Sequence, residues 1–258
     1  MADKHQRLQH TVHALQARYS VRAARFGREA GREWTPGLST GFRSLDAITG
    51  FAGLPLNAIS LLSGATTSGK QTLAYQCLRL AQAAYPRRPL VAVFDLARAA
   101  DPDYIARCGV DLKHLLIIRP PAPENALAAL ADALRGRQLR AIVVDGLPEL
   151  MAGPAARQAS AALPGLAALL DRSSCALIFL DEARAPWQRW LAGPERDAVR
   201  QSAALQIDLR REAWLDYDDH LRGYRAQARI ARSRLGRPGA SAAIEILFNG
   251  SVRARETW

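Results

Sequence analysis

Short apolar runs alternate with helix-like segments along most of the chain. The segments between the runs, such as residues 73–80 and 124–134, carry apolar side chains at helical spacing. Buried strands that alternate with helices in this way predict a parallel sheet covered by helices on both faces. The runs themselves read as buried strands and span residues 58–62, 90–95, 115–118, 141–145 and 176–181.

The last third of the chain has a different pattern. Residues 204–210 and 224–230 alternate between apolar and polar side chains, as half-exposed strands do, and residues 243–248 close the set. We therefore expect an α/β fold with one mixed sheet, mostly parallel in its middle and antiparallel at one edge.

An amphipathic helix is predicted over residues 5–28, where Leu8, Val12, Leu15 and Tyr19 form one apolar stripe. The Gly and Pro residues that follow predict a linker. The helix could pack on its own domain or dock on a neighbouring subunit, and its isolation by the linker favours docking. The expected division is a helix and linker for oligomerisation or docking at 1–35 and a nucleotide-binding core at 36–258.

Composition narrows the class of protein. Hydrophobic residues make up 49% of the chain, enough for a large core, yet no run of about 18 or more apolar residues predicts a membrane span. Residues 1–10 are polar and lack the apolar core of an export signal, so a cytoplasmic protein is expected. The three cysteines are scattered and predict buried thiols in a reducing compartment.

The formal net charge of +11 has two interpretations. It could reflect an arginine-rich surface that keeps the protein in solution, or it could indicate a polyanionic partner such as nucleic acid. Charge alone leaves both open.

A glycine-rich turn between the run at 58–62 and the helical segment at 73–80 has the pattern G-x-x-x-x-G-K. Strand, turn and helix in this order are the context of a phosphate-binding P-loop, in which backbone N–H groups and the helix N-terminus face the phosphates. Lys70 would add a formal charge, and it is one of only three lysines, with Lys4 and Lys113, among 35 Lys and Arg residues. ATP is therefore the expected ligand. The nucleotide-binding residues predicted in this stretch are Gly64, Ala65, Thr66, Thr67, Ser68, Gly69, Lys70, Gln71 and Thr72.

The pattern departs from a complete P-loop directly after the lysine. The expected Ser or Thr, whose hydroxyl binds Mg²⁺, is replaced by Gln71, and a hydroxyl follows one position later at Thr72. Asp145 ends an apolar strand, where a carboxylate of P-loop proteins holds the Mg²⁺ shell. Thr72 and Asp145 are thus the candidate magnesium residues, although Asp145 could instead cap a turn.

Several motifs around the loop resemble the bacterial RecA recombinase family. S-T-G-x-x-S-L-D begins at Ser39, and G-x-x-G-L-P begins at Gly50. The likeness continues through residues 93–95, 101–104, 108–112, 115–116 and 141–145. It covers most of the chain, including a RecA-like N-terminal helix, and implies a RecA-type P-loop core. Since the chain stops where the recombinase core would end, the additional C-terminal domain of RecA is expected to be absent.

The resemblance also implies roles for residues around the nucleotide. Asp101 and Tyr104 match residues that contact the adenine amino group and stack on its ring, although they could also serve as a helix N-cap and a core aromatic. Ala97 lies where RecA has the glutamate that activates water, and Glu182 lies in the Asn-Gln pair that senses the γ-phosphate. Because alanine accepts no proton and a carboxylate donates no hydrogen bond, weak hydrolysis or none is expected.

Two further regions match functional parts of RecA. A mobile DNA-binding loop matches the segment with Arg184, Trp187, Arg189 and Trp190, where the rings could stack on unpaired bases or form one edge that contacts a partner protein. The stretch from Met151 to Pro164 matches the other DNA loop and is shorter than in RecA.

A pair of arginines follows the last alternating strand. Arg232 and Arg234 match two lysines that approach the ATP of a neighbouring subunit, but they could also form an exposed basic turn.

Three functions follow from the sequence. The leading hypothesis is a DNA repair or damage-tolerance accessory that binds ATP weakly, binds single-stranded DNA, and assembles with a RecA-like recombinase or translesion polymerase. The RecA-like subunit of bacterial mutagenesis polymerase cassettes (ImuA) is a family of this kind. The alternatives are an active DNA-dependent ATPase and strand-exchange recombinase, and a nucleotide-independent filament cap or inhibitor.

Overall fold

The computed structural model describes residues 11, 14, 37–84, 89–182, 194–217, 220–248 and 252–253. By its internal contacts the chain divides into two units, Met1–Thr35 and Pro36–Trp258. The helix expected at residues 5–28 belongs to the first unit and lies outside the described residues, apart from residues 11 and 14.

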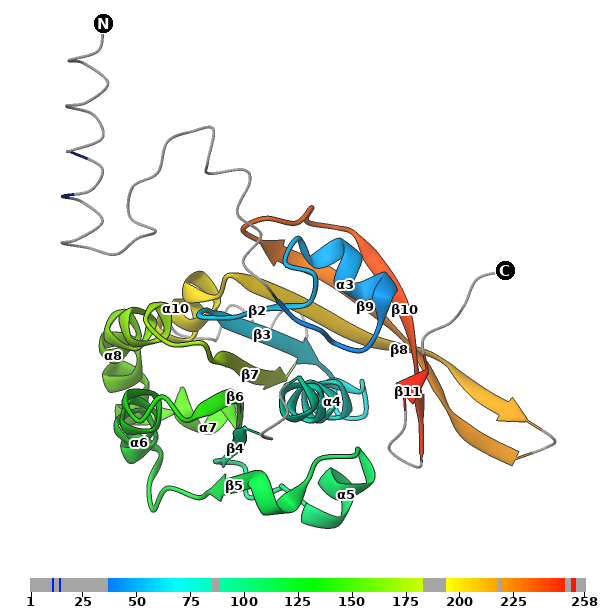
Figure 1. Ribbon diagram of the computed structural model, residues 1–258, viewed down its shortest axis with the longest axis horizontal. Helices are drawn as coiled ribbons and strands as arrows, with labels where there is room; N and C mark the ends of the chain where they lie inside the picture. Colours follow the sequence, from blue (N-terminus) through cyan, green and yellow to red (C-terminus); the bar gives the residue numbers. More distant parts are fainter. Residues whose placement is uncertain are drawn as a thin grey trace, which may run out of the picture. The chain divides into compact units, whose positions relative to one another are not determined.

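One large mixed sheet forms the centre of this unit (Figure 1). Pairing is parallel from β8 to β5 and antiparallel from β8 to β11, which confirms the mixed sheet predicted from the sequence. A separate pair is formed by β1 (Gly37–Leu38) and β2 (Leu54–Pro55). The described strands of the large sheet, in spatial order, are β11 (Val252–Arg253), β10 (Ser241–Leu247), β9 (His220–Ser233), β8 (Leu205–Tyr217), β3 (Ile59–Gly64), β7 (Ala176–Glu182), β6 (Leu139–Asp145), β4 (Leu90–Asp95) and β5 (Leu115–Ile118).

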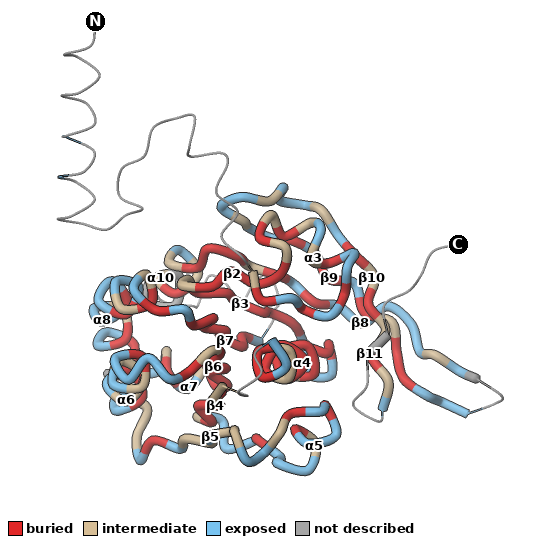
Figure 2. Tube along the Cα trace, in the orientation of Figure 1, coloured by how far each residue is buried: buried red, intermediate tan, exposed pale blue. Residues whose placement is uncertain are grey.

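The central strands are buried on both faces, as their continuous apolar sequences predict (Figure 2). Successive side chains of a strand point to opposite faces. In β4, Val91 and Val93 accordingly join one apolar cluster and Ala92 and Phe94 join the other.

Each apolar cluster is completed by its own helices. The cluster that contains Val91 takes in α3 (Arg43–Thr49), α4 (Lys70–Ala83) and α5 (Pro102–Arg107). The other takes in α6 (Pro123–Arg135), α7 (Leu147–Leu150), α8 (Gly153–Asp171) and α10 (Pro194–Ser202), as Figure 1 shows. The predicted three-layer α/β arrangement is therefore confirmed. A short 3₁₀ helix, η1 (Leu112–His114), precedes β5.

The three cysteines are buried and free, as expected. Burial raises the pKa of the Cys175 thiol to about 12 and that of Cys108 to about 11. These thiols are therefore protonated at neutral pH and pack as small apolar groups. None of the helices in the described part of the chain has both the length and the apolar character that a membrane crossing requires.

The hairpin of β8 and β9 is longer than the alternation predicted, since these strands continue to Tyr217 and start at His220. Their pairing shifts register between Arg211 and Ala213 and again between Leu215 and Asp216. A bulge of this kind interrupts the two-residue period, so the outer part of the ribbon lacked the strand signal.

Most of the stretch from Met151 to Pro164 is helical in the structure, unlike the DNA loop of RecA that it resembles. A turn at Met151 and Ala152 separates α7 from α8, which begins at Gly153 and runs through Pro164 to Asp171. Alanine, the strongest helix former, recurs through this stretch, and Pro154 stands at a helix start, where its missing N–H has no effect. The prediction of a loop at this position was therefore wrong.

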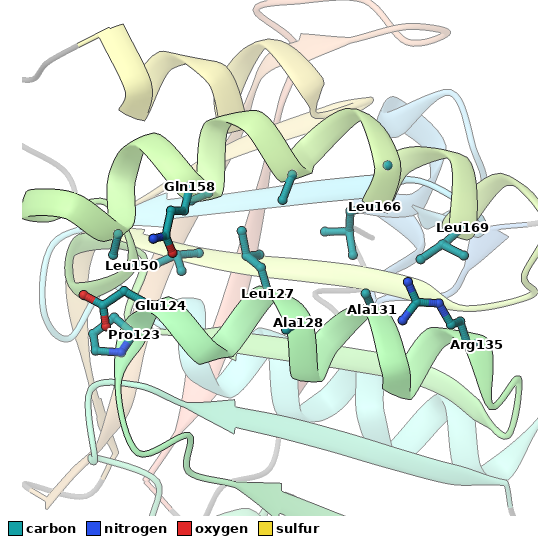
Figure 3. Close-up of a pocket in the computed structure, with 14 residues that line it drawn as sticks. Pro123, Glu124, Leu127, Ala128, Ala131, Arg135, Leu150, Gln158, Leu166 and Leu169 are labelled. Atoms are coloured by element: carbon teal, nitrogen blue, oxygen red, sulfur yellow. The ribbon is translucent and has the colours of Figure 1, made fainter.

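A groove of about 540 Å³ runs between α6 and α8 (Figure 3). Its walls are mainly alanine and leucine side chains, including Leu127, Leu166 and Leu169. Glu124 and Arg135 stand at its two ends in the view of Figure 3. The groove belongs to the helical layer on the side of the sheet away from α4.

Parallel pairing brings four strand ends to one edge of the sheet. Gly64 pairs with Glu182 where β3 meets β7, and Asp95 pairs with Asp145 where β4 meets β6. The chain leaves each strand at this edge, where ligands of open α/β sheets bind. The predicted P-loop, Ala97, Asp145 and Glu182 are thereby carried to the same place.

Candidate nucleotide-binding site

Two glycines permit the tight turn that connects β3 to α4. Gly69 has φ of 93°, and a Cβ atom there would lie 2.1 Å from Cδ1 of Ile246. A Cβ atom on Gly64 would lie 2.2 Å from the Ser68 hydroxyl oxygen. Larger residues at either position would push the loop away from β10 or from its own first turn.

Lys70 is the first residue of α4 and is buried, with 8% of its surface exposed. Its Nζ donates to the carbonyl oxygens of Gly64 at 3.1 Å and Ala65 at 3.3 Å. The ammonium group is thus held against the mouth of the turn by the loop itself, beside the N-terminus of the helix. This is the arrangement expected of a phosphate-binding lysine.

A pocket of about 540 Å³ opens in front of the loop. It brings together residues from five separate parts of the chain, most of which the sequence had singled out. Its lining includes Thr66, Thr67, Gly69, Lys70, Gln71, Thr72, Ala97, Tyr104, Asp145 and Glu182.

Gln71 and Thr72 point to different partners within this pocket. The Gln71 amide nitrogen donates to Oδ2 of Asp145 at 2.8 Å. The Thr72 hydroxyl lies 2.6 Å from the Tyr104 hydroxyl. Thr72 was the substitute metal ligand suggested by the sequence. Its hydroxyl is instead hydrogen bonded to Tyr104, whereas Gln71 is the residue that contacts Asp145.

Asp145 is 6% exposed and is the most buried carboxylate of the pocket lining. Burial raises the pKa of its carboxyl group, and the negative charges of Asp95 and Glu149 raise it further. The hydrogen bond from Gln71 and the charge of Lys70 act in the opposite direction. Desolvation is the largest of these effects, so the ionised form of Asp145 is disfavoured by folding.

Ala97 follows Asp95, whose carboxylate has a structural role. Asp95 accepts from the Arg119 Nε at 2.8 Å and from the backbone N–H of Ala99 at 2.8 Å, and its side chain is fully buried. The backbone N–H of Ala97 donates to the Asp145 carbonyl at 3.3 Å. Ala97 therefore lines the pocket beside Asp145 but contributes only a methyl group there.

Of the two residues expected to contact adenine, Tyr104 lines the pocket and Asp101 does not. Tyr104 lines the pocket and packs edge-on against Tyr75, with ring centroids 6.2 Å apart. Asp101 is absent from the pocket lining and accepts from the backbone N–H of Asp103 at 2.9 Å, as an N-cap of α5. The cap role weighed for Asp101 is therefore observed, and its contact with adenine stays a prediction.

The arginines expected to act across a subunit interface contact α10 of their own chain. Arg232 donates to the carbonyl oxygens of Arg200 at 3.2 Å and Gln201 at 3.1 Å, and Arg234 donates to that of Ser202 at 3.4 Å. Cations at a helix C-terminus are stabilised by its free carbonyl groups. Their contact with a neighbour's nucleotide stays a prediction, and the segment with Arg184, Trp187, Arg189 and Trp190 lies outside the described residues.

Three residues at the site were not anticipated. Glu149 lines the pocket from α7, and Tyr224 lines it from β9. Arg211 donates to the Thr67 hydroxyl at 3.1 Å and stacks on Trp214, with its Cζ 4.1 Å from the ring centroid. The position of Glu149 one turn after Asp145 could have signalled its approach, whereas the contact of Arg211 depends on the pairing of β3 with β8.

A magnesium ion at this site would have to be bound by Asp145 and the groups next to it. The group next to it is an amide N–H, which repels a cation, in place of the oxygen that Mg²⁺ requires. In the part of the chain that the structure describes, no group of three or more His, Cys, Asp or Glu residues is arranged to hold a metal ion. The donor set around Asp145 therefore does not fit Mg²⁺ as it stands.

The family follows from comparison with known proteins. Residues 7–253 match the model of the RecA N-terminal domain. The chain belongs to the RecA family. This confirms the resemblance drawn from the motifs and the RecA-type α/β core.

Individual RecA proteins are similar to most of the chain. The RecA proteins of Chlorobium limicola and Chlorobium chlorochromatii are each 29% identical to it over 234 residues, and that of Brucella suis is 29% identical over 232 residues. These alignments cover 84%, 84% and 83% of this chain, and 66%, 65% and 63% of the respective relatives. The chain thus spans slightly less than two thirds of the length of these RecA proteins.

The raised pKa of Asp145 predicts how Asp145→Asn changes stability. Because the folded-state pKa lies above the unfolded value, Asp145 favours folding most in acid, and this contribution is lost as pH rises through the folded-state pKa. Asparagine does not titrate and still offers Gln71 a carbonyl oxygen. The free energy of unfolding of Asp145→Asn relative to wild type should therefore increase above about pH 4.

Urea denaturation at a series of pH values measures this difference. Asp132→Asn is the matched control, since the Asp132 side chain is 74% exposed on α6. A stability difference for Asp145→Asn that falls or stays constant as pH rises would contradict the assigned effect of burial.

Proposed function

We propose that this chain is a RecA-like accessory protein of DNA repair or damage tolerance in the cytoplasm. In this proposal it binds ATP weakly, hydrolyses it slowly or not at all, and acts through binding to DNA and to a recombinase or translesion polymerase. Membership of the RecA family supports the DNA-related part, and the contents of the pocket support the nucleotide-related part.

The pocket lining is the observation that carries the proposal. Its phosphate side has the glycine turn and Lys70, so backbone N–H groups and one cation are available to a phosphate chain. Its hydrolytic side has Gln71 and Ala97, where phosphoryl transfer needs a metal-binding hydroxyl and a group that orients water. Binding is therefore supported better than turnover.

Tyr104 supports adenine as the base. It is half-buried, lines the pocket and lies close to the first turn of α4. An aromatic ring at this place can pack against a purine, and its hydroxyl is already engaged by Thr72.

Glu149 keeps an active ATPase as the second candidate function. Its carboxylate lines the same pocket as Asp145, and could accept a proton from water in place of the side chain that Ala97 lacks. A strand-exchange recombinase would need this activity to respond to DNA.

Lys70→Ala tests the nucleotide proposal directly. Removing a charge-assisted contact to phosphate should weaken equilibrium binding of a fluorescent ATP analogue by about tenfold or more. Lys113→Ala, which removes the same charge from an exposed site on η1, should leave the affinity unchanged.

Phosphate release from ATP should stay near background for the wild-type protein, with and without single-stranded DNA. Rapid release that DNA stimulates and that Glu149→Gln abolishes would support the recombinase alternative. Absence of nucleotide binding, unaffected by Lys70→Ala, would support the nucleotide-independent cap or inhibitor.

The tryptophan segment is the proposed contact to single-stranded DNA. A ring that stacks on a base contributes roughly 1–3 kcal/mol, so Trp187→Ala combined with Trp190→Ala should weaken binding of a fluorescent oligonucleotide measurably. Trp214→Ala, which removes an exposed ring from the β8–β9 ribbon, is the control. Equal affinity of the double variant and wild type would instead favour a protein-binding role for these rings.

The charge of Arg184 and Arg189 adds a salt-dependent part to this DNA contact. Replacing both with glutamine should make the logarithm of affinity fall less steeply with the logarithm of salt concentration, because fewer counterions are released. An unchanged slope would mean that the basic residues of this segment do not contact phosphates.

Residues 1–35 are the proposed docking segment, and residues 36–258 the nucleotide-binding core. Leu8→Asp with Leu15→Asp should reduce both self-assembly, measured by light scattering, and co-sedimentation with a RecA recombinase, because the charges interrupt the apolar stripe. Gln9→Asp with Gln16→Asp adds the same charge beside the stripe and should have little effect. If both double variants assemble like wild type, the docking role is wrong.

A further inference from the structure

Gln71 is the second residue of α4 and directly follows the phosphate-binding lysine. At this place a P-loop has the hydroxyl that carries the magnesium ion to the phosphates. Here the side chain ends in an amide whose nitrogen lies 2.8 Å from Oδ2 of Asp145. The two groups that would share a cation in a metal-dependent site are therefore bonded to each other.

The orientation of this amide follows from its chemistry. A carboxylate only accepts hydrogen bonds, so the NH₂ group of Gln71 has to face Asp145, because the carbonyl oxygen would set two acceptors against each other. A magnesium ion between the two side chains would break this bond and would need the amide to turn round. The amide thus supplies to Asp145 the favourable contact that a cation would otherwise supply.

A phosphate chain still needs positive charge, and the protein offers it from two sides of the loop. Lys70 is held at the mouth of the turn by the carbonyl groups of Gly64 and Ala65. On the other side of the loop, Arg211 lines a second pocket, donates to the Thr67 hydroxyl at 3.1 Å and is supported by the ring of Trp214. Thr67 lines both this second pocket and the pocket of Lys70, so it connects Arg211 to the nucleotide-binding side of the loop.

Two carboxylates oppose this charge. Glu149 and Glu182 line the pocket, and Glu182 accepts from the Thr66 hydroxyl at 3.4 Å. Two cationic side chains thus attract the phosphates, while the two glutamates and Asp145 repel them. This balance of charge is consistent with weak nucleotide binding.

We propose that this pocket binds the phosphates of a nucleoside triphosphate without a divalent cation. Gln71 satisfies Asp145 in place of the ion, and Arg211 adds a second positive charge from the other side of the loop, through Thr67. The inference rests on the proposed nucleotide binding and goes beyond it by specifying that the metal-free nucleotide is the ligand.

The experiment compares binding of a fluorescent ATP analogue in excess MgCl₂ with binding in EDTA. The wild-type dissociation constant should differ between the two conditions by less than about twofold. Gln71→Thr, which restores a hydroxyl and frees Asp145, should bind at least about tenfold more tightly in MgCl₂ than in EDTA. Thermal melting of each variant shows whether it is folded, and the wild-type comparison needs no variant at all.

Arg211→Gln tests the source of the second charge. It should weaken binding by about tenfold in both conditions, whereas Arg222→Gln, which removes an exposed arginine of the same ribbon that lines neither pocket beside the loop, should have no effect. Equal affinities for Arg211→Gln and Arg222→Gln would remove Arg211 from the proposal.

The same experiment distinguishes failure of metal independence from failure of nucleotide binding. Wild-type binding that occurs in MgCl₂ and is lost in EDTA would overturn metal independence and leave nucleotide binding in place. No binding in either condition would overturn both.

Discussion

The position of β3 between two parallel neighbours is the constraint on which the rest of the structure depends. Hydrogen bonds to β7 on one side and β8 on the other fix its register, and all of its residues are buried. The turn that follows can then leave the sheet only at the edge where β4, β6 and β7 also end. Gly64 and Gly69 allow it to do so within a few residues, and the first turn of α4 carries Lys70 and Gln71 into the pocket.

The same constraint separates the backbone of the candidate phosphate-binding loop from the side chains to which the resemblance to RecA assigns hydrolysis. The phosphate cradle of this loop is made of backbone, and its geometry depends on β3, the glycines and the helix N-terminus. The hydrolytic groups are side chains on separate strand ends, such as Ala97 after β4 and Asp145 at the end of β6. Because these side chains are not part of the loop that follows β3, the proposed loss of turnover does not require loss of the proposed nucleotide binding.

Apolar runs and helical spacing predicted the central strands, α4 and α6 to within a few residues, because burial on both faces leaves an uninterrupted signal. The outer ribbon beyond residue 210 and helix α8 at Gly153–Asp171 were missed. In the first case bulges broke the alternation, and in the second the likeness to a RecA loop outweighed the alanine-rich sequence.

At the site, the resemblance to RecA implied that the loop, Ala97, Tyr104, Asp145 and Glu182 surround one nucleotide, and these residues line one pocket of the structure. The hydrogen bond from Gln71 to Asp145 and the contact from Arg211 to Thr67 could not be predicted. The partners in these two contacts are 74 and 144 positions apart in the sequence. Which of their side-chain atoms meet depends on the folded structure, and no rule of residue spacing predicts it.

Burial links the identities of residues 71 and 145. An ionised carboxylate taken out of water needs a cation or hydrogen-bond donors, and without them it costs several kcal/mol or becomes protonated. Asp145 is almost fully buried, and the Asp95 and Glu149 charges add to the penalty. With a hydroxyl at position 71, a metal ion would be the natural compensation; with glutamine, the amide provides part of it. A P-loop can therefore keep its strand-end carboxylate without a bound ion, provided that the residue after the lysine is long enough and is a donor.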